Sequence, residues 1–308
     1  MSTRPPLTSS QSARAEPNDA ALGSKPATLR AGLYLVATPI GNLADITLRA
    51  LDVLSAAGTV ACEDTRVTRK LLNAYGVSRP LARYHEHNAE RVRPRLIERL
   101  KNGESVALVS DAGTPLVSDP GYKLVCAAIA EGLAVSSLPG ASAPLAALVV
   151  SGLPSDRFLY AGFLPVKRAA RRKALAELAS VPATLIVFES ARRLAAALQD
   201  MAQVLGSRSA AVVRELTKLF EEVRRGDLER LAEHYRAAGP PKGEVVIVVG
   251  PPESGTPKVE DLDDRLAAAL ERASLRDAAA KVAADTGLPR RQVYARALAL
   301  SGRDRGKA

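Results

Sequence analysis

Residues 106–121, VALVSDAGTPLVSDPG, decide the fold of this chain. Residues 106–109 form a short apolar run, typical of a buried parallel strand. Residues 110–115 are small or turn-forming, so they end the strand and leave backbone N–H groups exposed. Open α/β sheets bind ligands at the carboxyl ends of their strands, which makes this loop a candidate site. Taken alone, it is equally compatible with a tight connection that serves packing.

Further strands and small-residue loops surround this stretch. Residues 33–37 and 133–138 are predicted strands, followed by the loops TPIGN and PGASA. A strand at 60–62 ends in Glu63-Asp64-Thr65-Arg66. The predicted helices include one capped by Asp45, one around residues 68–72, one over 90–101, and one after Gly121 with Leu124, Val125, Ala128 and Ile129 on one face. This alternation predicts βαβ units and a parallel sheet.

Composition shifts divide the chain into four predicted parts. Residues 1–30 are rich in Pro, Ser, Ala and Thr and are expected to be disordered. Residues 31–152 form the first α/β domain, and a turn at 152–155 leads to a second α/β domain over 153–252, with a charged segment at 214–225. Residues 260–303 form a helical domain, in which Ser274 and Asp277 are a capping-box pattern and Gly287 ends a helix. Two helices joined by a short turn with glycine outline a helix-turn-helix.

Charge and composition narrow the function. The 308 residues carry a formal net charge of +10, which favours a polyanionic partner, most commonly nucleic acid. No apolar run reaches the roughly 18–20 residues that a membrane span needs, and the N-terminus lacks the apolar core of a secretory signal. Cys62 and Cys126 lie in or beside apolar runs, as buried reduced thiols do. We therefore expect a cytoplasmic protein.

Four motifs in order carry a family resemblance: TPIGNLADITLRAL, ACEDTR, VSDAGTPLVSDPG and LPGASA. Together with YHEHN, FES and RELTK, they closely resemble the ribosomal RNA small subunit methyltransferase I family. The resemblance implies a two-lobed α/β tetrapyrrole-methylase-like fold with a small C-terminal helix-turn-helix-like domain. It also implies S-adenosylmethionine (SAM) as cofactor, transfer of its methyl group to the ribose 2'-hydroxyl of a cytidine in 16S rRNA of the small ribosomal subunit, and a homodimer.

The same resemblance implies a donor pocket. Gly113, Thr114, Val117, Ser142 and Ala143 would line it. Pro39 and Ile40 would cover it, and Phe163 and Leu164 would close it from the second lobe, in the interdomain cleft. The chain departs from the wider tetrapyrrole methylases by keeping only Gly41 in the first loop and by having Gly113-Thr114-Pro115 in place of Gly-Asp-Pro. Both departures point to an RNA-modifying branch.

Methylation of a ribose hydroxyl requires removal of its proton, and a positioned base typically contributes about 10²–10⁴-fold. The candidates for catalytic groups are Glu63, Asp111, Glu189 and Lys218, with Asp64, Arg214 and Glu215 beside them. Each has a structural alternative. The acids at 63–64 could cap a helix, Asp111 could satisfy loop amides, and Glu189 could form a surface ion pair with Arg192 or Arg193. The residues alone do not select one base.

Binding sites for metal and RNA follow from spacing and charge. His85 and His87 share a strand face, but no third ligand has suitable spacing, and neither cysteine has a CxxC partner, so no metal is expected. RNA would contact two basic helices, through Arg168, Arg171, Arg172 and Lys173, and through Arg290, Arg291 and Arg296. Two rival interpretations are less consistent with the sequence. A tetrapyrrole methylase predicts no basic tail and a glycine-rich first loop, and both predictions fail here. A nucleic-acid-binding regulator with a vestigial enzyme domain predicts loops without their small residues, and Gly113, Gly140 and Ser142 argue against it.

Overall fold

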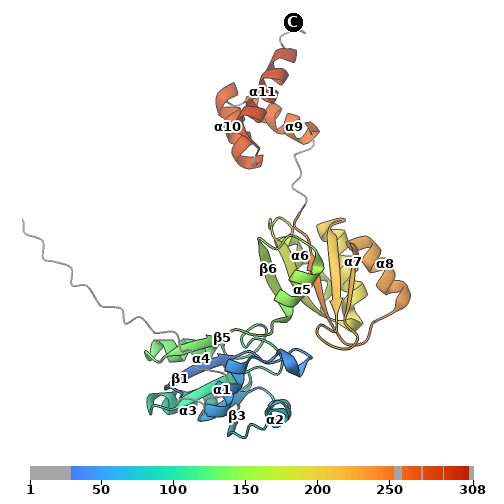
Figure 1. Ribbon diagram of the computed structural model, residues 1–308. Coiled ribbons are helices and arrows are strands. Elements are labelled where there is room, and N and C mark those ends of the chain that lie inside the picture. The colour runs from blue at the N-terminus through green and yellow to red at the C-terminus, as the bar shows by residue number, and fades with distance from the viewer. Residues whose placement is uncertain (1–28, 253–258, 272, 287, 305–308) are drawn as a thin grey trace, which may run out of the picture. The chain divides into compact units, whose positions relative to one another are not determined.

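The computed structural model describes residues 29–252, 259–271, 273–286 and 288–304 (Figure 1). The chain divides into two compact units, residues 1–142 and 143–308. Of the predicted disordered extension over 1–30, residues 1–28 lie outside the described part, as does Gly287.

The first unit is built on a five-stranded sheet in the order β3-β2-β4-β1-β5. Its strands are β1 Gly32–Val36, β2 Thr59–Cys62, β3 Leu81–Arg83, β4 Ser105–Val109 and β5 Val135–Leu138. All adjacent pairs are parallel, with Leu33 opposite Val106. The predicted parallel sheet is therefore confirmed, and the opening stretch supplies its buried central strand.

Helices cover both faces of this sheet. They are η1 Leu43–Asp45, α1 Leu48–Ala56, α2 Thr65–Ala74, α3 Ala89–Lys101 and α4 Tyr122–Ala130. Alternate residues of β4 point to opposite faces. Val106 and Leu108 pack in the core with α3 and α4, while Ala107 and Val109 pack in the core with α1 and α2. A strand buried on both faces explains the continuous apolar run.

Three local predictions in this unit were wrong. Thr47, not Asp45, caps α1, because its hydroxyl accepts a hydrogen bond from the Ala50 N–H, whereas Asp45 belongs to η1. On α4 only Leu124 and Ala128 are fully buried, and Ile129 is 62% exposed. Cys62 is buried as predicted, but Cys126 is exposed, since it lies half a turn away from Leu124 on the helix.

The second unit begins with a mixed sheet in the order β6-β7-β10-β8-β9. Its strands are β6 Phe158–Phe163, β7 Thr184–Ser190, β8 Ser209–Arg214, β9 Glu222–Asp227 and β10 Glu244–Val249. β6 and β7 are parallel, whereas β10 is antiparallel to both β7 and β8, and β9 is antiparallel to β8. The charged segment at 214–225 thus contains the start of an edge strand. Its sequence, EVRRGD, lacks the apolar run of a buried strand because an edge strand tolerates exposure.

The helices of this sheet are α5 Ala143–Ser151, α6 Arg168–Leu178, η2 Ala191–Arg193, α7 Leu194–Leu205 and α8 Leu228–Ala238. One core joins α6, α7 and α8 to the sheet and includes Leu175, Leu198 and Leu231. α5 packs against β10, β8 and β7, and Arg225 Nε on β9 donates to the carbonyl of Ser151 over 3.0 Å. These contacts place α5 in the second unit, ahead of the boundary predicted at residues 152–155.

Three helices form the C-terminal part: α9 Val259–Leu270, α10 Leu275–Thr286 and α11 Arg290–Asp304. Leu262, Leu266, Val282 and Val293 contribute to their shared core. The predicted cap of α10 is confirmed, because Asp277 N donates to Ser274 Oγ over 3.3 Å and Ser274 Oγ donates to Asp277 Oδ2 over 2.7 Å.

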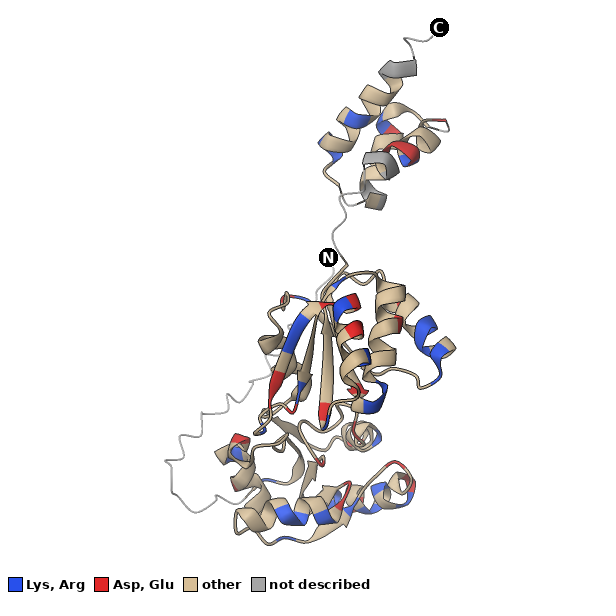
Figure 2. Ribbon diagram, turned by 90° about the vertical axis from the view of Figure 1, so that its right-hand side faces the viewer, with Lys and Arg blue, Asp and Glu red and all other residues tan. Residues whose placement is uncertain are grey.

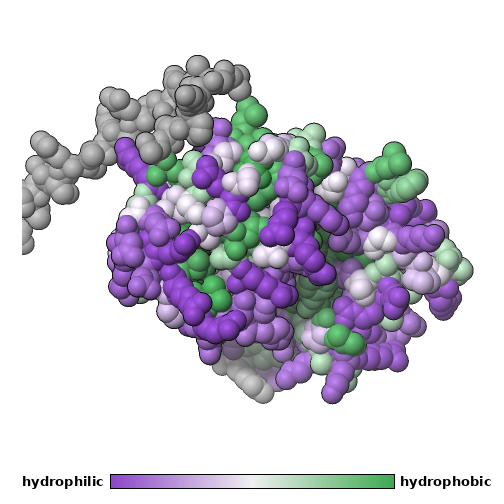
Figure 3. Space-filling model, turned by 90° about the horizontal axis from the view of Figure 1, so that it is seen from below, coloured by the Kyte–Doolittle hydropathy of each residue, from purple (hydrophilic) through white to green (hydrophobic). Residues whose placement is uncertain are grey.

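Hydrophilic residues cover most of the face seen from below, with separate apolar patches among them (Figure 3). Within the described residues, no helix combines the length and apolar character required to span a bilayer.

Candidate active site

Five loops meet at one edge of the first sheet. Because all five strands are parallel, their carboxyl ends share this edge. The loops span residues 37–47, 63–64, 84–88, 110–121 and 139–142. Pro39, Ile40, Glu63, Asp111, Gly113, Thr114, Val117 and Ser142, all predicted from sequence as site residues, lie in these loops. We call this edge the donor edge.

Hydrogen bonds join three loops of the donor edge. Thr38 and Gly113 exchange two backbone hydrogen bonds of 2.9 Å each. The Ser110 hydroxyl donates to the Gly113 carbonyl over 2.9 Å, and the Thr114 hydroxyl donates to the Ala141 carbonyl over 3.0 Å. The loops after β1, β4 and β5 therefore hold one another in place, as preorganised binding of a small ligand requires.

Close approach of the backbone to neighbouring atoms explains two glycines in the loops of the donor edge. Gly113 has a φ of 84°, and a Cβ there would lie 3.2 Å from Ile40 Cγ2. At Gly140 a Cβ would lie 2.8 Å from the Ala37 Cβ. Leu116 and Ser118 adopt positive φ values of 72° and 65° without being glycine. Such backbone strain costs about 1–3 kcal/mol per residue and concentrates at functional sites.

Four carboxylates gather at the donor edge. Asp111 Oδ1 accepts from the Asp64 N–H over 3.0 Å. Burial, then the charge of Asp111, raises the pKa of Glu63. Burial, then the charges of Glu63 and Asp111, raises the pKa of Asp119 to about 6. The sequence interpretation missed Asp119, and its place in the same loop as Asp111 is the signal that could have found it.

Asp64 has a structural role in this cluster. Its side chain caps α2 by accepting from the Arg66 N–H over 2.8 Å, and it also pairs with the Arg66 guanidinium. The side-chain hydrogen bond from Arg66 is the main cause that lowers the pKa of Asp64 to about 2. The helix-capping alternative thus holds for Asp64, while Glu63 stays available.

His85 and His87 lie beside this cluster, with ring centroids 5.9 Å apart. His85 Nδ1 is buried without a hydrogen-bond partner. Among the residues that the structure describes, no group of three or more His, Cys, Asp and Glu side chains is placed to hold a metal ion.

Several other predicted site residues lie at one edge of the second sheet. Since β10 is antiparallel to both β7 and β8, and β6 is parallel to β7, the carboxyl ends of β6, β7 and β8 lie together. Phe163, Glu189 and Lys218 lie at or just beyond these ends. Phe163 is 58% exposed and packs edge-on against Phe188, whereas Leu164 is buried in the core. A contact from Leu164 to a ligand would therefore come from its backbone.

Glu189 is buried, not a surface residue. Its Oε1 accepts from the Ser190 N–H over 2.7 Å and pairs with Arg193 at 2.6 Å, with the Glu189 side chain fully buried. Its Oε2 is buried without a hydrogen-bond partner. The alternative of a surface ion pair is therefore only partly right. Arg193 is the partner of Glu189, but the Glu189 carboxylate is buried.

Lys218 is held by two carboxylates. Its Nζ lies 2.8 Å from Glu215 Oε1 and 2.9 Å from Glu244 Oε2. Burial alone would lower the pKa of Lys218, but these hydrogen bonds outweigh burial and raise that pKa. Glu215 adopts a φ of 50° and also accepts from the Glu244 N–H, so this group fixes the turn after β8.

Two of the arginines predicted to contact RNA instead form hydrogen-bonded ion pairs within the protein. Arg171 is buried against Asp200, and Arg296 forms hydrogen bonds of 2.6 and 2.5 Å to Asp263. Figure 2 shows the basic and acidic residues spread over the helices and strands of the described part of the chain.

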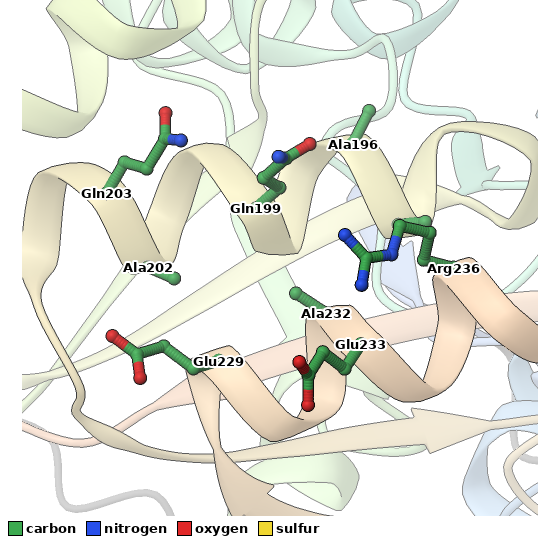
Figure 4. A pocket seen from close by; sticks show the side chains of 9 residues that line it. Ala196, Gln199, Ala202, Gln203, Glu229, Ala232, Glu233 and Arg236 are labelled. Carbon is green, nitrogen blue, oxygen red and sulfur yellow. The ribbon is translucent and has the colours of Figure 1, made fainter.

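A groove between α7 and α8 lies apart from the predicted residues (Figure 4). It has a volume of about 350 Å³. Its lining consists of Ala195, Ala196, Gln199, Ala202, Gln203, Glu229, Ala232, Glu233 and Arg236. None of the predicted catalytic or donor-binding residues contributes to it.

Comparison with known proteins agrees with this architecture. The family model "Tetrapyrrole (Corrin/Porphyrin) Methylases" matches residues 32–232, and the model "RsmI C-terminal HTH domain" matches residues 256–301. Diphthine synthase, a solved structure, shares the fold with a TM-score of 0.55 and 19% identity, over 71% of this chain and 89% of that one.

Two curated relatives are named ribosomal RNA small subunit methyltransferase I. The one from Mesorhizobium japonicum is 57% identical over 273 residues, covering 88% of this chain and 93% of that protein. The one from Halalkalibacterium halodurans is 46% identical over 272 residues, covering 85% and 93%.

The fold and the matched family define a SAM-dependent methyltransferase of the tetrapyrrole-methylase class. Within this class, the chain belongs to the ribosomal RNA small subunit methyltransferase I family. The predicted fold class, the C-terminal helix-turn-helix and the cofactor are thereby confirmed.

Proposed function

We propose that this protein transfers a methyl group from SAM to the ribose 2'-hydroxyl of a cytidine in 16S rRNA of the small ribosomal subunit. Family membership is the observation that carries the proposal, because it extends over most of the chain and includes both the methylase and the C-terminal matches. The net charge of +10 suits a polyanionic substrate. A substrate in the small ribosomal subunit supports a cytoplasmic location for the enzyme in this proposal.

The donor edge fits SAM. A cradle that a Cβ at Gly113 or Gly140 would crowd lets backbone amides and carbonyls reach the ligand closely. Bound SAM supplies an electrophilic methyl group. In this proposal the residues that contact it are Pro39, Ile40, Gly113, Thr114, Val117, Ser142, Ala143, Phe163 and the backbone of Leu164.

Glu63 is the base in this proposal. It must take the proton of the attacking hydroxyl, and its pKa is raised toward the working pH by burial and by Asp111. Asp111 acts on Glu63 through its charge, while its Oδ1 holds the Asp64 amide. Glu189 is fully buried, and its role in this proposal is to position Arg193 through their ion pair. Lys218 holds the turn after β8 through Glu215 and Glu244.

The decisive experiment measures methyl transfer from labelled SAM to small subunits taken from cells that lack the modification. Free rRNA and a tetrapyrrole are assayed in parallel. The expected product is label in 16S rRNA at a linkage that resists alkaline cleavage, as 2'-O-methylation requires. Label in the tetrapyrrole alone would overturn the proposal, and absence of label in all three would favour a binding protein.

The same assay tests Glu63. The Glu63→Gln variant should lose about 10²–10⁴-fold in kcat while keeping its SAM affinity, because only the proton acceptor is removed. An unchanged kcat would exclude Glu63 as the base.

A further inference from the structure

Helix α6 begins with a dense cluster of basic residues. Lys167, its N-cap, is followed by Arg168, Arg171, Arg172 and Lys173. Three of the four cations within the helix converge on one acid, Asp200 of α7, which is 2% exposed. The arrangement places one carboxylate against three guanidinium groups.

Arg171 accounts for the burial of Asp200. Its Nε and one terminal nitrogen donate to Asp200 Oδ2 over 2.9 and 2.5 Å, and its other terminal nitrogen donates to the Val166 carbonyl over 3.1 Å. Arg171 is 4% exposed. All three of its nitrogens are thus used, and its charge alone compensates that of Asp200.

Arg168 and Arg172 are held differently. Each lies with its Nε 3.1 Å from Asp200 Oδ1. Their terminal nitrogens form no hydrogen bond with any residue in the described part of the chain. Their side chains are 62% and 39% exposed. The buried acid therefore orients Arg168 through an Nε hydrogen bond. It holds Arg172 by charge at ion-pair distance, although Arg172 Nε forms no hydrogen bond. The terminal N–H donors of both side chains are left for another acceptor.

The local charge favours an anion. After Arg171 has compensated Asp200, Arg168 and Arg172 contribute two uncompensated positive charges. The exposed Lys167 and Lys173 flank them, with no ion pair to a described residue. The guanidinium terminal donors match the oxygens of a phosphate, and a guanidinium held in place loses less entropy on binding than a free one.

We propose that Arg168 and Arg172, oriented by Asp200, form a clamp for the phosphate backbone of the RNA substrate. The two residues lie one helical turn apart, roughly 6 Å along the helix axis. The inference rests on the proposed function for the identity of the RNA. It assigns Arg171, by contrast, to the α6–α7 anchor and not to the substrate.

Binding of the full chain to isolated 16S rRNA, titrated across KCl concentrations, tests the clamp. The variant Arg168→Gln/Arg172→Gln should bind at least tenfold more weakly. Its slope of log affinity against log salt should be shallower by about 1–2, because each phosphate contact contributes roughly 0.7–0.9. Its melting temperature and SAM affinity should stay those of the unmodified chain, since Arg171 and Asp200 are kept.

Two comparisons separate an oriented clamp from general positive charge. Arg91→Gln/Arg95→Gln removes the same charge at the same spacing from exposed positions on α3, where no described carboxylate orients them. Its loss of affinity should be much smaller. Arg168→Lys/Arg172→Lys keeps the charge but removes the Nε anchor, and it should still bind several-fold more weakly than the unmodified chain. Equal losses in the α3 and α6 variants, or a lysine variant that binds normally, would overturn the clamp.

Methyl transfer to small subunits is measured with the same protein preparations, so that the clamp and the proposed function are tested independently. If the unmodified chain binds RNA through the clamp but transfers no methyl group to small subunits, the proposed function fails and the clamp stands. If transfer occurs and the glutamine variant retains both KM and salt dependence, the clamp fails and the function stands.

Discussion

Gly113 shows how one residue shapes the donor edge. Its φ of 84° favours glycine, and its missing side chain leaves room beside Ile40. Gly103 offers a matched comparison, because it has a similar φ of 82° and a Cβ added there would meet no atom within 4 Å.

The Gly113→Ala and Gly103→Ala variants should therefore differ in binding. Both incur about 1 kcal/mol of backbone strain, but only Gly113→Ala pushes against Ile40 and shifts the cradle. We expect the SAM dissociation constant, measured by calorimetry, to rise at least tenfold in Gly113→Ala and to stay unchanged in Gly103→Ala. Similar SAM affinities in the two variants would show that Gly113 does not contribute to the donor site.

Asp119 predicts a pH dependence of stability. Its folded-state pKa of about 6 lies above the unfolded value of about 3.9, so folding favours the protonated acid. The contribution of Asp119 to the free energy of unfolding is fully present below about pH 4 and is lost as the pH rises through about 6. Asp119→Asn should thus be more stable than the unmodified chain at pH 7, by about 1 kcal/mol after allowing for solvent screening. Urea unfolding at pH 4.5 and pH 7 measures this, and a gain of equal size at both values would contradict it.

Residue roles could be predicted only in part from sequence. Glu63 and Asp111 are brought to one edge as parallel strands require. Asp119 was not predicted, because its burial beside two acids depends on tertiary packing and only its place in the same loop as Asp111 points to the site. Arg171 and Arg296 have the same side chain as their exposed arginine neighbours, but they form ion pairs with Asp200 and Asp263. A partner on another helix is invisible in the local sequence.

At the scale of elements, the contact between α6 and α7 depends on a buried charge. Removing Asp200 leaves Arg171 buried and unpaired, which typically costs about 3–5 kcal/mol. We expect Asp200→Ala to lower the free energy of unfolding by that amount. Glu131→Ala, which breaks the pair with Lys101 on the surface, should cost no more than about 1 kcal/mol. Denaturant unfolding of both variants checks the contrast, and equal losses would refute it.

Apolar runs predicted the buried strands of the first sheet, whereas a charged edge strand gave no such pattern. β4 is buried and its sequence predicts a strand, but β9 is a charged edge strand that pairs with β8 alone. Its hydrogen bonds come from β8, the strand that precedes it along the chain. α1 was predicted as a helix with the wrong cap, because Asp45 and Thr47 are both good caps and the short turn η1 separates them.

At the scale of the whole molecule, we propose that the protein is a homodimer, as its family resemblance implies. Light scattering coupled to gel filtration should give a mass near twice the 32.4 kDa of one chain. The mass should be the same at low and high salt if apolar surface dominates the interface. A mass of one chain at micromolar concentration would contradict the dimer.

The sequence by itself determined the parallel first sheet, the loops that end its strands, the helical C-terminal part and the family. These properties follow from local patterns: apolar runs, glycines and caps act over a few neighbouring residues. Tertiary structure alone decided that the second sheet is mixed, that Glu189 is buried with an unused oxygen, and that Asp200 divides the α6 arginines into one anchor and two exposed donors. Those outcomes depend on which distant groups share a low-dielectric environment, and burial and pairing are set by packing between elements.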